Sequence, residues 1–320
     1  MLLREDRLDS VGNNELPALE HLLERKGQQI ERFLALRPRF QEIVASMGKP
    51  PEWFVVCEWQ RLLGKLAERW TPYPPVGFLR APEILEAVHV NGNAEWATAQ
   101  AKLLQARLPD RVLATVLPED PLGFPVIRES KTLASHQHLH TLCHIVRWLA
   151  HTGELRLPGT VVEWGGGYGT FAKLYRRLAI AGGDSREHTH ILIDVPLMAG
   201  LQWLYLSAVF GSDEVCIPVE GRRGLLKIVP GKFNIVPAHL CGLIGPRADM
   251  FVSTWALSES PDKVQCLVQK LRFFGAPHLL MAHQKPSKRY PDAARILAKL
   301  PRPFDREPCG YISDNWYVFK

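Results

Sequence analysis

The sequence lacks the features that mark membrane-spanning, secreted or disulfide-stabilised proteins. No uncharged apolar run approaches the ~20 residues needed to cross a bilayer. The first residues, MLLREDR, are charged and contain no apolar signal core. The 6 cysteines are scattered without a C-x-x-C pair, which argues against disulfides and zinc sites. We therefore expect reduced thiols and a cytoplasmic location.

A strong charge of one sign is also missing. The net charge of +6 over 320 residues allows an anionic substrate without requiring one. No aromatic-basic motif of an RNA-binding sheet is present, and basic side chains gather only in residues 284–307. Such a run is usually a solvated face, but it could also contact phosphate or carboxylate on a nucleotide sugar or glycan. We expect no nucleic-acid partner.

Glycine, by contrast, is concentrated in one place. Residues 160–171 read TVVEWGGGYGTF, and apolar side chains then recur at helical spacing through Ala179. The pattern predicts a strand, a tight turn and a helix, the first βα unit of an open α/β sheet. A turn without Cβ atoms lets the backbone approach a ligand, and the helix N-terminus offers unpaired N–H groups to it.

Two cofactor classes bind turns of this kind. The dinucleotide fingerprint G-x-G-x-x-G needs a third glycine where the sequence has Thr170 or Ala172. Alanine is tolerated there, so NAD is weakened but not excluded. The pattern that fits throughout is acid-x-Gly-x-Gly-x-Gly, which begins at Glu163. It resembles motif I of the class I S-adenosylmethionine methyltransferases, in which the acid lies near the methionine end of S-adenosyl-L-methionine.

A second acid ends the next predicted strand. Residues 190–194 read HILID, and Pro196 opens a helix behind them. A carboxylate at the carboxyl end of the second strand can accept hydrogen bonds from two ribose hydroxyls. Asp194 could instead cap that helix, but the glycine turn upstream favours ribose binding.

Three blocks in this order carry a narrower resemblance. They read EWGGGYG at 163–169, IDVP at 193–196 with LQWLYLS at 201–207, and DMFVSTWALSE at 249–259. From about residue 125 onward the chain resembles a family of sugar O-methyltransferases of bacterial surface-polysaccharide and glycosylated natural-product pathways. The resemblance implies a sugar or glycan acceptor, whether free, nucleotide-linked or polymeric. Trp164 departs from the family pattern, which has a small aliphatic residue there.

The expected fold is α/β, namely the Rossmann-like class I methyltransferase fold preceded by an α-helical N-terminal region. This fold has a seven-stranded, mostly parallel sheet with an antiparallel C-terminal strand. We place the boundary so that residues 1–117 are helical and residues 118–320 form the S-adenosylmethionine-binding domain. The helical region could cap the active site, form a homodimer surface, or both. Its helices are expected over residues 15–48 with a break at Pro38, 51–70, 82–90 and 94–107.

Six further strands are expected after Asp194. Phe233–Pro237 is preferred as the third core strand, with residues 215–219 and 225–229 as an inserted hairpin. Glu220 or His239 would then lie near the cofactor, unless both are plain loop residues. Residues 249–254 and 277–282 read as the fourth and fifth core strands, and residues 316–319 as an antiparallel edge strand.

Ligands of open α/β sheets lie at the carboxyl ends of the strands. The expected S-adenosyl-L-methionine contacts are therefore the glycine turn and the acids and strand ends beside it: Glu163, Gly165, Gly166, Gly167, Tyr168, Gly169, Asp194, Ser253, Thr254 and Trp255.

Methyl transfer to a hydroxyl needs a group that accepts the proton. His283, after the fifth strand, is the first choice for this general base and Glu259 the second. Alternatively, Glu259 caps the next helix and His283 packs beside the cofactor. No cluster of acids of the Mg-dependent catechol type is present, so we expect a metal-independent reaction.

The histidine-rich helix expected over residues 130–148, ended by Gly153, precedes the glycine turn. His136, His140 and His144 share one face, which could chelate a metal, although polar packing is the more common role of such histidines. In the resembled family this segment lines the site, which makes His136, Gln137 and His138 expected substrate contacts. Other functions stay open: a methyltransferase for another small-molecule or amine acceptor, a non-catalytic S-adenosylmethionine-binding protein, or an RNA-binding module.

Overall fold

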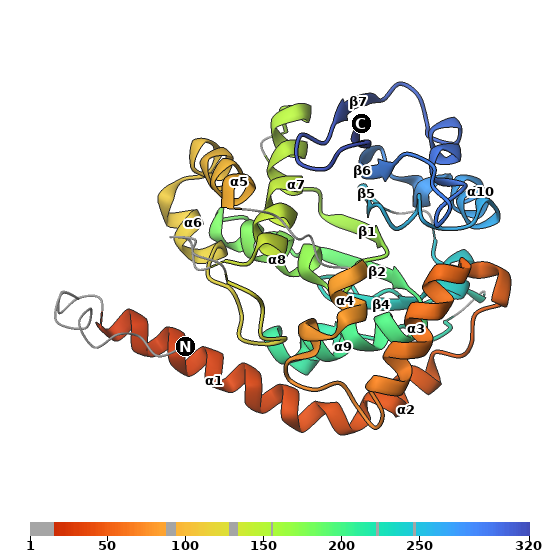
Figure 1. Ribbon diagram of the computed structural model, residues 1–320. Coiled ribbons are helices and arrows are strands. Elements are labelled where there is room, and N and C mark those ends of the chain that lie inside the picture. The colour runs from red at the N-terminus through yellow and green to blue at the C-terminus, as the bar shows by residue number, and fades with distance from the viewer. Residues whose placement is uncertain (1–15, 88–93, 128–133, 155, 222–223, 246–247) are drawn as a thin grey trace.

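The computed structural model describes residues 16–87, 94–127, 134–154, 156–221, 224–245 and 248–320. Its centre is one eight-stranded sheet with the order β3-β4-β2-β1-β5-β6-β8-β7 (Figure 1). Neighbouring strands from β3 to β6 are parallel, and β8 is antiparallel to both β6 and β7. The strands are β1 Thr160–Trp164, β2 Thr189–Asp194, β3 Val215–Cys216, β4 Phe233–Pro237, β5 Met250–Thr254, β6 His278–Gln284, β7 Asp305–Pro308 and β8 Asn315–Phe319.

The order β4-β2-β1-β5-β6-β8-β7 is that of the class I methyltransferase fold, which confirms the expected fold class. Parallel strands covered on both faces need nearly continuous apolar sequence, and the TVVEW, THILID and MFVST segments meet this need. Phe233–Pro237 is the third core strand, as predicted. β3 adds an eighth, two-residue strand beyond it, and an isolated antiparallel bridge joins Glu220 to Leu226 within the expected hairpin.

The prediction that the C-terminal strand lies at the edge of the sheet is wrong. β8 is an inner strand, because β7 pairs along its outer side. β7 has the sequence DREP and is mostly exposed, so it carries none of the apolar alternation by which a strand is recognised.

Helices cover both faces of the sheet (Figure 1). One face, with Val161, Leu192 and Val252, packs against α7 His136–Thr152, α8 Thr170–Ala181 and α9 Pro196–Phe210. The other face, with Val162 and Phe251, packs against α10 Asp262–Lys270 and neighbouring 3-10 turns. As expected, Gly153 ends the histidine-rich helix in a left-handed conformation; the helix begins at His136, and residues 130–133 lie outside the described ranges.

The N-terminal region is helical, as predicted, and shares core with the sheet domain. Its helices are α1 Leu16–Leu36, α2 Phe40–Ser46, α3 Cys57–Arg69, α4 Pro82–Ala87, α5 Ala94–Arg107 and α6 Asp110–Val116. Pro38 divides α1 from α2 in a 3-10 turn. α3 begins at Cys57 and not at Pro51, α6 was not predicted, and residues 88–90 of the helix expected at 82–90 lie outside the described ranges.

The buried side chains of Phe33 and Phe40 pack α1 and α2 against α9. α5 packs on α7, and α6 packs on α8. The helical region therefore wraps one side of the sheet domain. Within the described part of the chain, no helix combines the length and apolarity needed to cross a membrane.

Candidate active site

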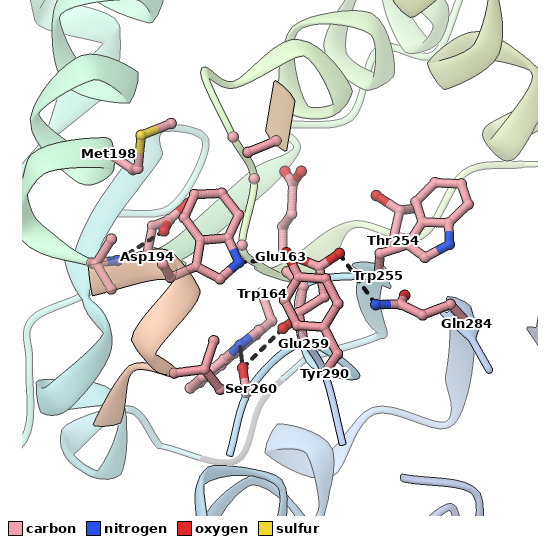
Figure 2. Close-up of a pocket in the computed structure, with 18 of the residues that line it drawn as sticks. Glu163, Trp164, Asp194, Met198, Thr254, Trp255, Glu259, Ser260, Gln284 and Tyr290 are labelled. Atoms are coloured by element: carbon pink, nitrogen blue, oxygen red, sulfur yellow. Dashed lines mark hydrogen bonds between the residues drawn. The ribbon is translucent and has the colours of Figure 1, made fainter. Parts of the chain in front are cut away.

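A cavity of about 610 Å³ lies along the carboxyl edge of the sheet. That volume is typical of a site for a cofactor and a small molecule. The ends of β1, β2, β5 and β6 form its floor, and α3 of the N-terminal region closes one side. Figure 2 shows Asp194 and Met198 on one side of this cavity and Trp255 and Gln284 on the other.

The glycine turn lies at the centre of the cavity edge. Gly165, Gly167 and Gly169 have φ angles of 73°, 59° and 96°, which favour glycine. A Cβ on Gly165 would lie only 2.0 Å from the Cβ of Ala256, so a side chain there would push into the cavity wall. Gly165, Gly166, Gly167 and Tyr168 line the cavity, whereas Gly169 begins α8 behind them.

The carboxylate of Glu163, on β1, lies against this turn. Its Oε2 lies 2.8 Å from Nε2 of His190 on β2. Its Oε1 lies so close to Gly166 that an added Cβ would be 3.0 Å away. Glu163 therefore lines the cavity with its carboxylate held between the neighbouring strand and the turn.

Asp194 ends β2 and faces the cavity. Its Oδ1 accepts from the backbone N–H of Val195, and its Oδ2 accepts from Nε2 of Gln202, both at 2.8 Å. Gln202 also donates to the carbonyl of Gly167, which ties the acid to the glycine turn. Each carboxylate oxygen keeps a lone pair for a ligand hydroxyl. Burial raises the pKa of Asp194 to about 7, against the effect of these hydrogen bonds.

The end of β5 supplies Thr254 and Trp255, and both line the cavity. Trp255 has φ 69°, a conformation that a bulky residue rarely adopts, and its ring lies beside those of His140 and His144. Ser253, the third residue expected here, is fully buried, and its Oγ accepts from the N–H of Leu257. It therefore shapes the loop without lining the cavity.

Trp164 lies where the resembled family has a small residue. Its indole lines the cavity, stacks on Phe54 at 6.2 Å and donates to Ser260 at 3.4 Å (Figure 2). The larger side chain joins β1 to the segment before α3, and so to the N-terminal region.

Glu259 projects into the same cavity (Figure 2). Its Oε2 accepts from Nε1 of Trp59 at 3.0 Å, and its Oε1 accepts from Nε2 of Gln284 at 3.4 Å. Burial raises its pKa to about 7, and the two hydrogen bonds oppose that rise. Near neutral pH this carboxyl can therefore both hold and release a proton.

His283 does not line the cavity. Its ring stacks on Trp316 at 5.3 Å, and its Nε2 accepts from Nε of Arg306 at 3.1 Å. Burial and the Arg306 charge lower its pKa to about 4. The reason is the register of β6, which runs on to Gln284; because side chains alternate along a strand, Gln284 faces the cavity and His283 the opposite side. This geometry gives no support to His283 as the base.

Of the three substrate contacts expected at the start of α7, only Gln137 lines the cavity. His138 is fully buried, with Nδ1 2.9 Å from Glu119 and Nε2 2.7 Å from the carbonyl of Val116. His136 is buried outside the cavity lining. Thr141 and His144 do line it, one and two turns after Gln137, so helical spacing counted from Gln137 could have found them.

The histidines of α7 pack with polar and aromatic partners. Nδ1 of His140 lies 2.8 Å from Nε2 of Gln100, and its ring meets that of His144 at 4.4 Å. Among the described residues, no group of three His, Cys, Asp or Glu side chains is placed to hold a metal ion. Glu220 and His239 do not line the cavity, although Ala238 next to His239 does.

Comparison with known proteins adds little to this geometry. No family model and no curated protein matches the sequence. Similar solved structures include the mitomycin 7-O-methyltransferase MmcR (13% identity over 96% of this chain and 99% of that one, TM-score 0.35). A second is an rRNA methylase from Escherichia coli (17% identity over 88% of this chain and 99% of that one, TM-score 0.35). A third is human N-acetylserotonin methyltransferase in complex with SAM (12% identity over 70% of this chain and 65% of that one, TM-score 0.31). These TM-scores are too low to support any statement about function, so the fold assignment rests on the strand order.

Proposed function

We propose that this chain is an S-adenosyl-L-methionine-dependent O-methyltransferase that acts on a sugar hydroxyl. One observation carries the proposal. The same cavity is lined by the glycine turn, by Asp194 at the position of a ribose-binding acid, and by the carboxyl of Glu259. Burial raises the pKa of both carboxyls to about 7.

The residues of the cavity fit this cofactor. Asp194 offers an oxygen lone pair to each of two ribose hydroxyls. A Cβ on Gly165 would overlap Ala256, and one on Gly166 would press on the Glu163 carboxylate, so the turn keeps its place at the cavity edge only with glycine there. Glu163 and the turn would hold the methionine end, and Thr254 and Trp255 also line the cavity. When bound, the cofactor supplies a methyl group activated by its sulfonium.

Glu259 acts as the general base. An alcohol is a poor nucleophile until its proton begins to leave, and a carboxylate with a pKa near the working pH accepts that proton efficiently. Trp59 and Gln284 hold its two oxygens from the sides, so the free lone pairs face the cavity. The reaction is then metal-independent.

The acceptor half of the cavity suits a sugar. It combines polar side chains with the rings of Trp59 and Tyr290, and Lys285 at its exposed rim could pair with an anionic group of the acceptor. The polar side chains are Gln137, Thr141, Gln284, Asp314 and Asn315. This mixture, together with the sequence resemblance, favours a glycan or nucleotide-linked sugar over a wholly apolar acceptor.

The N-terminal region, residues 1–117, serves as a cap on the domain formed by residues 118–320. α3 contributes Trp59 and Leu63 to the cavity. Because α1 and α2 bury apolar side chains against α9 of their own chain, the cap role is favoured over a homodimer surface. The cysteines are all free, in keeping with the cytoplasmic location we propose.

Calorimetry and a transfer assay test the proposal. We expect S-adenosylmethionine and its demethylated product to bind the wild-type protein, and Asp194→Asn to weaken that binding at least ~10-fold because a ribose acceptor is lost. Transfer of labelled methyl groups to a panel of glycans and nucleotide sugars then identifies the acceptor. Binding of NAD in place of the sulfonium cofactor would refute the assignment.

A further inference from the structure

Trp59 links the N-terminal region directly to the candidate base. It lies on α3, 200 residues before Glu259 in the sequence, and its indole N–H donates to Oε2 of Glu259 at 3.0 Å. Both side chains line the same cavity. It is shorter than the hydrogen bond that the Glu259 carboxylate accepts from Gln284.

The other oxygen of Glu259 is held from the sheet. Nε2 of Gln284 donates to Oε1 of Glu259 at 3.4 Å (Figure 2), and the side-chain Oε1 of Gln284 lies 3.2 Å from Oγ of Ser258, whose hydroxyl is also 2.7 Å from the Trp255 carbonyl. Two donors on opposite sides fix the rotation of the carboxylate, since each oxygen has its own partner. One of the two hydrogen bonds that orient the Glu259 carboxylate therefore comes from the N-terminal region.

Exposed ion pairs hold α3 over the cavity rim. Arg289, in the loop after β6, lies 3.6 Å from Glu58 and 3.3 Å from Glu86, and Arg61 pairs with the same two acids. Solvent-exposed pairs of this kind contribute little free energy each. These pairs alone therefore do not hold α3 rigidly over the cavity rim.

We propose, building on the function proposed above, that Trp59 is a positioning residue through which the closed cap aims the Glu259 carboxylate at the acceptor hydroxyl. In that step the acceptor oxygen forms a bond to the methyl carbon as the methyl–sulfur bond breaks. The electron pair of that bond stays on sulfur, and the acceptor proton passes to Glu259. Without the indole N–H, the carboxylate is free to rotate and its anion loses a stabilising donor.

The variant that tests this is Trp59→Phe, which keeps a ring but removes the donor. The direct readout is a carbon-13 NMR titration of the glutamate carboxyls, with Glu259→Gln assigning the signal. We expect the Glu259 midpoint to rise by about one pH unit, because a hydrogen bond to a charged group is lost. Trp53→Phe is the matched control. Trp53 is 48% exposed and does not line the cavity, so the Glu259 midpoint should not move in this variant.

Activity gives the second readout. We expect kcat of Trp59→Phe to fall more than about tenfold at neutral pH and to recover only in part at higher pH, with the acceptor KM little changed. The recovered part reflects the shifted Glu259 midpoint, and the remaining loss reflects the carboxylate that is no longer aimed. A Glu259 midpoint that stays in place or falls in Trp59→Phe would show that the indole N–H does not act on the Glu259 carboxylate and that Trp59 only packs the cap, which would overturn the proposal. The NMR titration needs no substrate, so failure of the wild-type protein to bind the sulfonium cofactor would reject the proposed function separately.

Discussion

At the scale of single residues, Asp194 and Glu259 have the same shifted pKa but different tasks. Burial raises both values to about 7. The oxygens of Asp194 are held by a backbone N–H and by Gln202, which itself holds the glycine turn, so this acid belongs to the cofactor half. Those of Glu259 are held by Trp59 and Gln284 in the acceptor half. Position, more than acidity, separates the proposed ribose acceptor from the proposed base.

The first prediction concerns Glu259 as base. Glu259→Gln should lower kcat by ~10²–10⁴-fold, because the amide cannot accept the proton, while cofactor affinity stays nearly unchanged. In the wild type, kcat should rise with pH through about 7, since only the ionised carboxyl is active. Steady-state rates measured from about two pH units below to two above neutrality provide the check, and the midpoint of the rise in kcat should lie at about 7. Replacing His283 by Asn is the comparison; equal losses for both variants would contradict the assignment.

The second prediction is a stability change at the same residue. The folded-state pKa of Glu259 lies above its unfolded value of 4.5, so between these values the folded protein binds more protons than the unfolded chain. The contribution of Glu259 to stability is therefore present at low pH and is lost as pH rises through about 7. Glu259→Gln removes the buried charge and should raise the Tm of the cofactor-free protein at pH 8 more than at pH 5. Thermal unfolding of both proteins at the two pH values measures these changes in Tm. A larger gain in Tm at pH 5 than at pH 8 would contradict a raised pKa of Glu259 in the folded state.

What the sequence could predict at this scale follows from local pattern. Glu163, Asp194 and the glycines were found because each stands where a strand ends or a turn must lack Cβ atoms. His283 was misplaced because the strand was expected to end at residue 282, whereas β6 continues to Gln284. His283 is therefore a residue within the strand, and its side chain faces away from the side that Gln284 faces. Trp59 was missed because its contact with Glu259 spans 200 residues, which no local periodicity encodes.

At the scale of elements, the β1–turn–α8 unit determines where the proposed cofactor would lie. Its strand and helix were predicted because buried parallel strands are continuously apolar and helices repeat every three to four residues. By contrast, β7 is polar and exposed and carries no such pattern; it forms along the free edge of β8. β3 falls within the strand expected at residues 215–219, but it has only two residues and pairs with β4.

The third prediction tests the turn. Gly165→Ala should abolish measurable cofactor binding while the protein stays folded, because the new Cβ would overlap Ala256 and displace the cavity wall. Gly183→Ala is a matched control, since Gly183 has a similar φ of 77° but no atom within 4 Å of an added Cβ. Both variants carry the same backbone strain, so calorimetry with the demethylated cofactor isolates the overlap. Equal affinity in the two variants would show that the turn is not the cofactor cradle.

At the scale of the whole molecule, a buried charge network joins the N-terminal region to the sheet domain. Nζ of Lys173 on α8 lies 3.2 Å from Glu119 and 2.9 Å from Asp120, in the segment that links the two regions. Gln29 of α1 donates to Asp120, and Arg177 pairs with it at 2.7 Å. Burial alone would lower the pKa of Lys173, but the two carboxylates outweigh it and keep the amine charged.

The final prediction follows from that network. Lys173→Met should destabilise the protein by about 3–5 kcal/mol, because it leaves two buried carboxylates without their shared cation. The loss should also loosen α1, since Gln29 depends on Asp120 for its hydrogen bond. Lys232→Met is the control: Lys232 makes an equally short pair, 2.7 Å to Glu214, but at the surface, where water replaces the partner at little cost. Urea unfolding measures the free energies, and limited proteolysis reports on α1. If the two variants lost the same stability, the network would be an ordinary surface cluster, and the attachment of the cap would depend on the apolar packing of α1 and α2 against α9.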